Sequence, residues 1–463
     1  MVRSAAMPAD DDKLGPGRDG LEPQRRRWAA IAIWVTLVLA VLDVSIVNVA
    51  LPVISKRLDV TPDEAVWVVN SYQVAITMLL LPLGALGERF GFRRVYLSGV
   101  ALFALASLGC TLATNLPGLV ASRFLQGIGA AAIMSLNGAL VRIIFPRALL
   151  GRAVGYNALV IAVSSAAGPS VAAAVLAVGS WRWLFAINVP IAIGALALGL
   201  RFLPPSPLRE HPFEWGTGLL IAIVFAAFFF GAADLGHGAA LERWLPEFLI
   251  TAAGLALLWH LSRANPAPML PLDLLRLRVL RLSYITSACS FGAQMIAFVT
   301  MPFIFEGRNA ISHVEIGLMM TPWPLATAIA APLSGRLVER VPASLLGCCG
   351  LVATSAGLAL FALLPPTAGA VPIALALALA GAGFGFFQAP NNRTLIGAAP
   401  IARSGAAASM QAMARLVGQT GGAIAVALMF GAFSSASIIP IWVAAALALV
   451  GAGTSQLRRN ELT

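Results

Sequence analysis

Long apolar segments recur along this chain from Trp28 to Val450, and short polar breaks separate them. Roughly 20 helical residues cross the hydrocarbon core of a bilayer, so the pattern predicts about fourteen membrane-spanning helices. The chain is 59% hydrophobic and 11% charged, whereas soluble domains carry about 25% charged residues. We therefore expect an all-α polytopic membrane protein without a soluble domain. The expected helices are 29–51, 66–87, 95–114, 118–141, 153–177, 183–203, 215–234, 246–262, 283–305, 315–335, 343–364, 371–392, 404–432 and 436–455.

The chain begins with a polar segment, residues 1–28, that is mixed in charge and rich in Pro and Gly. This composition is typical of a disordered tail, and the segment lacks the apolar region of a cleaved signal peptide. The first helix is therefore expected to be an uncleaved anchor. The short segment Arg276–Arg281 is interpreted as a basic approach to the ninth helix and not as part of it.

A short sequence echo indicates two related halves of six helices each. GALGER, which contains Gly84, Glu88 and Arg89, recurs with the same spacing as GRLVER, and each lies at the end of the second helix of its group. Six-helix repeats are typical of secondary transporters. The two helices near 215–262 fit neither half. We expect a bundle at 29–203, a linker with two extra helices at 204–264, a second bundle at 265–455 and a tail at 456–463.

The formal net charge of +11 invites a comparison with nucleic-acid-binding proteins, but the placement of the basic residues argues against nucleic acid. Strongly and weakly basic breaks alternate along the chain. This asymmetry predicts that both termini are cytoplasmic, with most basic residues on that side and some near anionic lipid. The outer breaks would hold only Lys56, Arg57, Arg182, Arg243 and Arg308, and two further arginines, Arg123 and Arg415, lie inside expected helices.

Asp43 lies well inside the first apolar segment, within LDVSIVNVALP. A carboxylate at this depth is costly, so it is expected to take up a proton or to pair with a cation. Arg123 opens RFLQGIGAAAIMSLNGALV, in which Gln126 and Asn137 share its helical stripe and small residues allow close helix contact. The guanidinium must face a cavity or an acid, and the alternative is a snorkelling or packing arginine.

Two further motifs can be interpreted either as functional or as purely structural. GALGERFGFRR is expected to form a short loop whose charges lock one conformation, or simply an orientation-setting solvated loop. Gly168-Pro169 predicts a kink in the fifth helix, either as part of the mechanism or as scaffold. The loop motif comprises Gly84, Glu88, Arg89, Gly91, Arg93 and Arg94.

Five motifs, which follow one another along the chain and are given at the end of this paragraph, resemble those of the major facilitator superfamily, specifically its fourteen-helix drug:proton antiporter branch. The resemblance covers residues 29 to 455. The chain departs from the family pattern at Glu88, where Asp is usual, at Ser45, where Thr is commoner, and near the Gly-Pro pair, where Ser164, Ala172 and Ala173 replace glycines. The motifs are LDVSIVNVALP, GALGERFGFRR, RFLQGIGAA, the Gly-Pro pair followed by WRWLFAINVP, and RSGAAASMQAMARLVGQTGGA.

The resemblance implies two six-helix bundles plus two inserted helices in the plasma (inner) membrane. It implies a monomeric multidrug exporter that exchanges protons for small lipophilic compounds, cations included, by alternating access. Asp43 and Arg123 would couple protons to transport, because burial favours the protonated carboxyl and a nearby arginine favours the ionised one. No cofactor is expected, since the proton gradient supplies the energy. A metabolite facilitator or importer on the same scaffold is the alternative, and a non-transporting membrane scaffold or sensor is a further one.

Other polar residues are candidates for a substrate cavity, although single polar side chains often serve as interhelical contacts. Glu306 is either a second proton site or an interfacial carboxylate paired with Arg308. No phosphate-binding loop, nucleophile elbow or metal-ligand spacing occurs, so neither an enzyme nor a metal site is expected. The cavity candidates are Asn48, Gln73, Gln126, Asn137, Gln294, Glu306, Trp323, Asn391 and Arg415.

Overall fold

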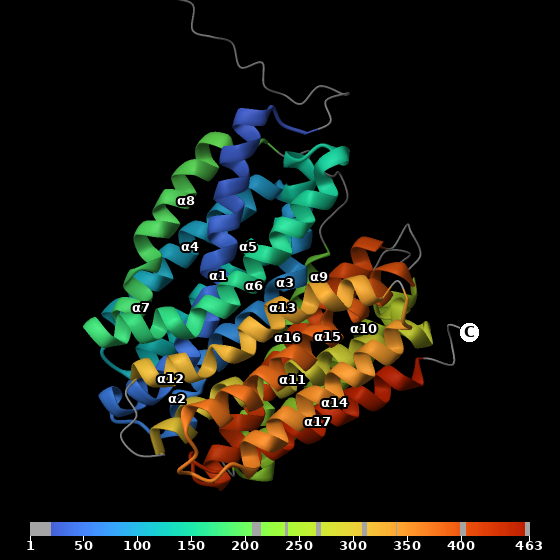
Figure 1. Ribbon diagram of the computed structural model, residues 1–463. Coiled ribbons are helices and arrows are strands. Elements are labelled where there is room, and N and C mark those ends of the chain that lie inside the picture. Colours follow the sequence, from blue (N-terminus) through green and yellow to red (C-terminus); the bar gives the residue numbers. More distant parts are fainter. Residues whose placement is uncertain are drawn as a thin grey trace, which may run out of the picture.

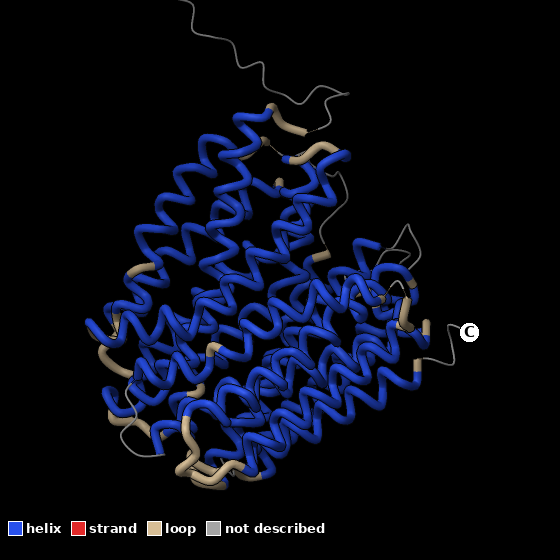
Figure 2. Tube along the Cα trace, viewed as in Figure 1, coloured by secondary structure: helices blue, strands red, loops and turns tan. Residues whose placement is uncertain are grey.

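The computed structural model describes residues 20–205, 214–236, 239–264, 270–307, 313–338, 340–398 and 404–458. Within these ranges the regular elements are all helices (Figure 2). Fourteen of the helical segments are long and apolar enough to cross a membrane. The expected all-α class and the number of helices are both confirmed.

The first six spans form one bundle, drawn in blue to green in Figure 1. The second span and the sixth span are each interrupted near the same end of the bundle, where a short helix precedes a long one. The elements are α1 (Pro23–Leu58), α2 (Pro62–Ala65) with α3 (Trp67–Phe90), α4 (Phe92–Leu112), α5 (Leu116–Ile144), α6 (Arg147–Val178), and α7 (Trp183–Ala186) with α8 (Asn188–Phe202).

The last six spans form a second bundle, and two further helices lie between the bundles in sequence. The extra pair is α9 (Trp215–Gly236) and α10 (Leu241–Ala264). A short 3₁₀ helix, η1 (Leu272–Arg276), leads into the second bundle. Its helices are α11 (Arg278–Gly307), α12 (His313–Met320) with α13 (Pro322–Leu337), α14 (Ala343–Leu363), α15 (Ala370–Gly397), α16 (Ser404–Ala432) and α17 (Ile439–Leu457).

Several helix ends differ from the expected ones by five or more residues, and three of the starts show this clearly. Helix α1 begins at Pro23, not at residue 29, because proline suits the first helical position and the segment is anchored by a hydrogen bond from the Leu21 N–H to the Ile144 carbonyl, 3.0 Å. Helix α11 begins at Arg278, so part of the segment interpreted as a basic approach is helical. Helix α10 begins at Leu241, five residues early, and Pro246 lies inside it.

The end of the chain is also more structured than a free tail. Arg458 follows α17 directly and is buried, and its guanidinium donates to Ser283 Oγ (2.8 Å) and Asn391 Oδ1 (2.6 Å). Burial lowers the pKa of Arg458 to about 10, which leaves it charged at neutral pH. Residues 459–463 lie outside the described residues.

The two bundles meet at the end of the molecule that contains α2, α7 and α12, and they diverge toward the end where α1 begins and α17 ends (Figure 1). We call the first of these the closed end. Ser170 Oγ of α6 lies 3.0 Å from Thr321 Oγ1, which links the bundles there, and Lys56 Nζ lies 2.8 Å from Glu306 Oε1. Farther from this end, Thr77 of α3 contacts Thr420 of α16 at 3.0 Å.

The inserted pair packs beside the junction of the bundles. Val74 of α3, Phe229 of α9 and Ile424 of α16 belong to one buried cluster. Helix α9 therefore contacts both bundles along one side of their interface.

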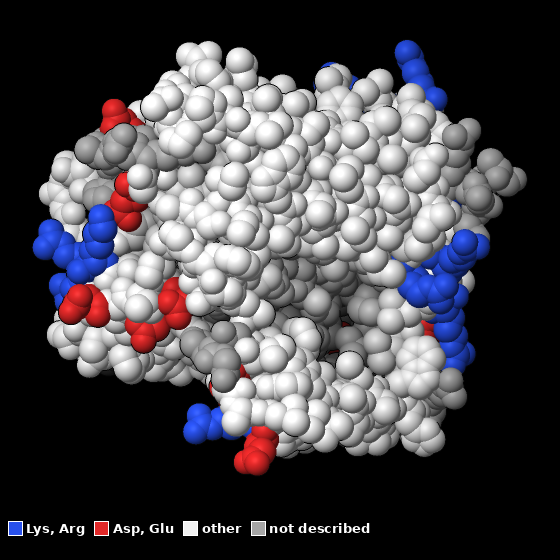
Figure 3. Space-filling model, turned by 90° about the horizontal axis from the view of Figure 1, so that it is seen from below, with Lys and Arg blue, Asp and Glu red and all other residues white. Residues whose placement is uncertain are grey.

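The surface separates charge from apolar side chains as a bilayer requires. Figure 3 shows Lys, Arg, Asp and Glu gathered mainly toward two opposite ends of the view, with a broad uncharged surface between them. The spanning helices expose many large apolar side chains, such as Leu105, Val178 and Leu363. In water such a surface would be costly, whereas lipid chains cover it without loss.

Candidate functional site

Asp43 and Arg123 are in direct contact inside the first bundle. Asp43 lies near the middle of α1, and Arg123 lies in the second turn of α5. Both side chains are buried, and Arg123 Nη1 donates to Asp43 Oδ2 in a buried ion pair. Removing one partner from a buried pair leaves an uncompensated charge at a cost of about 3–5 kcal/mol, so the two residues must be considered together.

The second carboxylate oxygen of Asp43 accepts two more hydrogen bonds. Gln126 Nε2, one turn after Arg123 on α5, donates at 3.0 Å, and Asn188 Nδ2 at the start of α8 donates at 2.8 Å. Asp43 thus accepts three hydrogen bonds from three different side chains. This arrangement suits a carboxylate without a proton, because such a group can only accept hydrogen bonds. Helices α1, α5 and α8 therefore converge on one acid, and we call Asp43, Arg123, Gln126 and Asn188 the carboxylate network.

Arg123 is fixed by a second helix as well. Its Nε donates to the Val68 carbonyl of α3 at 3.0 Å, and its Nη1 also donates to Gln126 Oε1 at 2.6 Å. The guanidinium carbon lies 4.2 Å from the centre of the Tyr72 ring, a cation–π contact. Arg123 Nη2 is buried without a partner among the described residues. Arg123 thus bridges α1 and α3 and retains an unused donor.

The glycines of RFLQGIGAA allow α5 to approach its neighbours this closely. A Cβ at Gly127 would lie 2.5 Å from the Tyr72 carbonyl oxygen of α3, and one at Gly129 would lie 2.6 Å from the Gly99 carbonyl oxygen of α4. Both contacts are with backbone, which cannot give way easily. The expected small-residue surface therefore positions Arg123 and Gln126 against α3 and α4.

The loop motif is mostly helical. Glu88 and Arg89 belong to the last turn of α3, and Arg93 and Arg94 belong to the first turn of α4, so the expected loop shrinks to Gly91. Gly91 has φ +95°, a conformation that favours glycine, which explains the abrupt reversal. Arg93 donates to the Leu200 carbonyl of α8, which ties this corner to the helix that carries Asn188. Gly84 lies in α3 near Ser135 of α5. In the second copy of the motif, Glu339 lies outside the described residues.

Gly168 and Pro169 form a contact on both sides of α6. A Cβ at Gly168 would lie 2.3 Å from Ser45 Cβ of α1, in the same bundle. On the other side, a Cβ at Gly317 of α12 would lie 2.4 Å from the Pro169 carbonyl oxygen and 2.6 Å from Ala173 Cβ. The motif thus packs the first bundle against the second at the closed end, and Ala173 is part of that contact.

Several expected cavity residues carry buried polar atoms without a hydrogen-bond partner among the described residues. Buried polar groups are normally paired, so these atoms are candidates for contact with a ligand or water. Asn137 lies eleven residues beyond Gln126 on α5 and is not part of the carboxylate network. The atoms are Asn48 Oδ1, Gln73 Nε2, Asn137 Oδ1 and Trp323 Nε1.

Arg415 and Gln294 are half-buried on α16 and α11 of the second bundle. Arg415 lies one turn after Gln411, whose amide donates to Asn392 Oδ1 of α15 at 2.5 Å, so this stripe of α16 faces α15. Arg415 Nε is buried without a partner, and Arg415 makes no ion pair with a described residue.

Two expected cavity residues have other partners. Asn391 donates to Ser287 Oγ at 2.7 Å and accepts from Arg458, so its amide links α11, α15 and the end of the chain, and its place in a substrate cavity stays a prediction. Glu306 pairs with Lys56 across the bundles, and Arg308, the partner considered from sequence, lies outside the described residues.

Asn188, Tyr72 and Ser107 were not among the expected site residues. Asn188 had one signal, its place within WRWLFAINVP. Tyr72 and Ser107, whose hydroxyl accepts from Gln126 Nε2 at 2.9 Å, had none, because only helix packing brings α3 and α4 to Arg123 and Gln126. Among the described residues, no group of three or more His, Cys, Asp or Glu side chains could hold a metal ion.

Comparisons with known proteins show relatives in sequence and a similar fold among solved structures. The chain is 44% identical to the uncharacterized transporter YebQ of Escherichia coli K12, over 96% of this chain and 98% of that protein. It is 30% identical to the multidrug resistance protein Stp of Mycobacterium tuberculosis (strain CDC 1551 / Oshkosh), over 89% of this chain and 77% of Stp. The fold resembles that of the crystallised POT family transporter PepTSo, with TM-score 0.72 and 15% identity over 95% of this chain and 98% of that one.

The sequence of residues 33–423 matches the Major Facilitator Superfamily, which covers α1 to α16 and includes the whole carboxylate network. The match, the fourteen spans and the bundle architecture agree, and this protein is a membrane transporter that belongs to the Major Facilitator Superfamily.

Proposed function

We propose that this transporter is a proton-coupled antiporter that exports small lipophilic compounds, cations included, across the plasma (inner) membrane. The observation that carries the proposal is the buried ion pair of Asp43 and Arg123, with two further donors on the same carboxylate. A facilitator driven only by its substrate's gradient has no need of a titratable acid in the apolar interior, where a charge is costly. The name of the relative Stp, a multidrug resistance protein, supports the substrate class.

Proton uptake at Asp43 would require the carboxylate network to rearrange. The carboxyl group of Asp43 accepts three hydrogen bonds. Protonation would remove the negative charge that attracts the Arg123 guanidinium. Arg123 also binds α3 through Val68 and Tyr72, and α3 contacts α16 of the other bundle through Thr77 and Thr420. Release of Arg123 would therefore change the restraint on a helix that lies at the bundle interface, which is how one proton could bias alternating access.

We further propose that both termini are cytoplasmic and that the transporter acts as a monomer. The excess of basic residues in the breaks on the side of the termini supports this orientation. The closed end would then face outward, and the structure would correspond to an inward-facing state. A membrane potential supplies about 2.3 kcal/mol per charge per 100 mV, which exceeds the about 1.4 kcal/mol that a tenfold gradient of a neutral substrate requires.

The test uses purified protein in liposomes with an imposed pH gradient. Uphill transport of members of a compound panel should require the gradient, should stop when a protonophore is added, and should be absent from empty liposomes. Addition of a transported compound to the detergent-solubilised protein should also release protons into a weakly buffered solution. Transport that is indifferent to the pH gradient, without proton release, would contradict the antiport.

A metabolite facilitator or importer is the second candidate, because Arg415 Nε, buried without a partner among the described residues, and the half-buried amide of Gln294 would suit a polar metabolite. For this class, transport should follow the substrate gradient alone, and the Asp43→Asn variant should keep its rate of counterflow. These results separate the two candidates in the same liposomes.

A further inference from the structure

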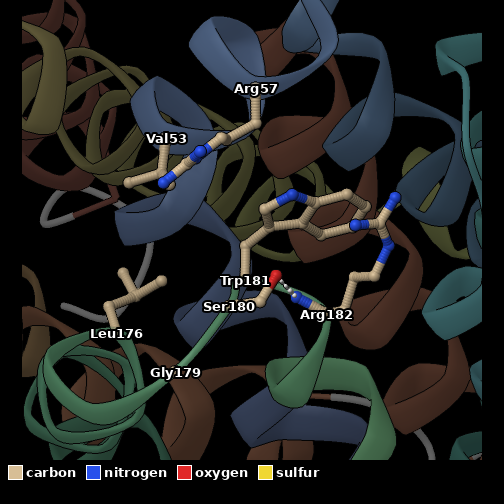
Figure 4. Close-up of a pocket in the computed structure, with 7 residues that line it drawn as sticks. All are labelled: Val53, Arg57, Leu176, Gly179, Ser180, Trp181 and Arg182. Atoms are coloured by element: carbon tan, nitrogen blue, oxygen red, sulfur yellow. Dashed lines mark hydrogen bonds between the residues drawn. The ribbon is translucent and has the colours of Figure 1, made fainter.

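A cavity of about 520 Å³ lies at the closed end of the first bundle, between α1 and the segment that joins α6 to α7. No member of the carboxylate network lines it, so it is separate from the candidate coupling site. Its lining residues, drawn in Figure 4, are Val53, Arg57, Leu176, Gly179, Ser180, Trp181 and Arg182.

The cavity has a basic side and an apolar side. In Figure 4 the indole of Trp181 lies between the side chains of Arg57 and Arg182, and the guanidinium of Arg57 extends toward Val53. Val53 and Leu176 supply the aliphatic wall. No acidic residue is among the seven lining residues, so the cavity favours an anion with an apolar part.

One of the two arginines is free to bind. Arg182 is held by its contact with Trp181, at 4.9 Å from the ring centre, and by its bond from Nη2 to the Ala113 carbonyl at 3.0 Å. Arg57 is exposed and makes no hydrogen bond or ion pair with a described residue, whereas its neighbour Lys56 pairs with Glu306. The cavity thus contains the guanidinium of Arg182, which is held in place, and that of Arg57, which has no partner among the described residues.

The depth of the cavity matches the headgroup level of a bilayer. Arg57 belongs to the last turn of α1, and Gly179–Arg182 follow the last residue of α6. The neighbouring side chains Val178 and Trp183 are 90% and 61% exposed, which places a lipid-facing surface beside the opening. Exposed tryptophan is typical of the membrane–water interface.

We propose that this cavity binds the headgroup of an anionic phospholipid. The phosphate would accept hydrogen bonds from Arg57, from the remaining N–H groups of Arg182 and from the Ser180 hydroxyl, since guanidinium groups suit phosphate geometry. An acyl chain would lie along Val53 and Leu176. Inorganic phosphate would use only the basic side, and a zwitterionic lipid would bring an ammonium group to which the cavity offers no acid.

The test measures lipid binding to the purified full-length protein in detergent, by native mass spectrometry and by the shift in melting temperature, with phosphatidylglycerol, phosphatidylcholine and inorganic phosphate as separate probes. Phosphatidylglycerol should stay bound and raise the melting temperature more than phosphatidylcholine. Arg57→Gln should weaken phosphatidylglycerol binding about fivefold, the contribution of one basic residue near a membrane surface. Arg243→Gln, an exposed arginine of α10 outside the cavity, is the matched control and should bind as the wild type does.

A second variant tests the apolar wall. Leu176→Trp keeps both arginines and fills the space along Val53, so it should reduce phosphatidylglycerol binding while the protein remains folded, as judged by its melting temperature without lipid. Equal binding in Arg57→Gln and Arg243→Gln would overturn the proposal. So would a melting-temperature shift that inorganic phosphate alone reproduces, because the ligand would then be a free anion.

Discussion

Asn188 donates a 2.8 Å hydrogen bond to Asp43 Oδ1 from the first turn of a helix that ends at Phe202, beside the Arg93–Leu200 contact. Gln126 donates to the same oxygen, and Arg123 donates to the other one. Each donor therefore holds the carboxyl group of Asp43 from its own position on a helix. Substitutions in the carboxylate network can therefore be ordered by expected effect, from loss of the acid, through loss of the cation, to loss of a neutral donor.

Neutralising the acid should abolish coupling. Asp43→Asn keeps the size of the side chain and removes the titratable proton, so the protein should still insert into the membrane but lose uphill efflux driven by a pH gradient. The measurement is transport in liposomes with an imposed gradient. Glu242→Gln, an exposed acid in the first turn of α10, is the control and should transport normally. Normal proton-driven transport by Asp43→Asn would remove Asp43 from the mechanism.

Variants of Arg123 should shift the pH dependence of substrate binding. Without the cation, Asp43 should take up its proton at higher pH, and protons should compete with substrate there, so the midpoint of binding in Arg123→Ala should move upward. Arg123→Lys should move it less, because lysine keeps the charge and loses the planar donor pair. Binding to purified protein over a pH series gives the midpoints. An unchanged midpoint in Arg123→Ala would reduce Arg123 to a packing role.

Asn188→Ala should produce a smaller shift in the same direction. A hydrogen bond to a charged group is worth about 1.5–3 kcal/mol, so its loss should raise the midpoint, by less than the loss of the cation in Arg123→Ala. The same pH series measures it. Loss of stability with an unmoved midpoint would show that Asn188 serves packing only.

The Lys56–Glu306 pair should favour the closed end only weakly. The Lys56 side chain is 70% exposed, and such pairs contribute about 1 kcal/mol or less, so Lys56→Gln should raise the accessibility of the closed end by no more than about fivefold. Labelling rates of a cysteine introduced at Ser170 report this accessibility. The swap Lys56→Glu with Glu306→Lys should restore the wild-type rate, and failure to do so would mean that the pair has no latch role.

Gly317→Val should open the closed end more strongly. Any Cβ at this position meets the Pro169 backbone at 2.4 Å, so α12 and α6 must separate. The same labelling rate should rise, and transport should slow. Gly194→Val is the control, because a Cβ at Gly194 meets nothing within 4 Å. If the two variants label alike, the α6–α12 contact does not control access.

The local sequence was sufficient to predict the helices, because the apolar side chains of each helix must either pack in the interior or face lipid. Periodicity and length predicted the fourteen spans, and errors arose at ends such as Arg278 and Pro23. At Pro23, a proline at the first position and the hydrogen bond from Leu21 to Ile144 extend the helix beyond the apolar run. Asp43 and Arg123 were evident as charges inside apolar segments, for the same energetic reason.

The partners of those charges were decided by packing alone. The sequence placed Asp43 and Arg123 eighty residues apart, and only the approach of α5 to α1 and α3, which Gly127 permits, brings them together with Asn188 and Tyr72. Packing also turned Asn391 toward Arg458, and in the part of the chain that the structure describes it left Arg415 without an ion pair. Hydrogen bonds within a helix are local and can be predicted from sequence, whereas contacts between helices depend on rotations and offsets that the sequence specifies only through the assembled interface.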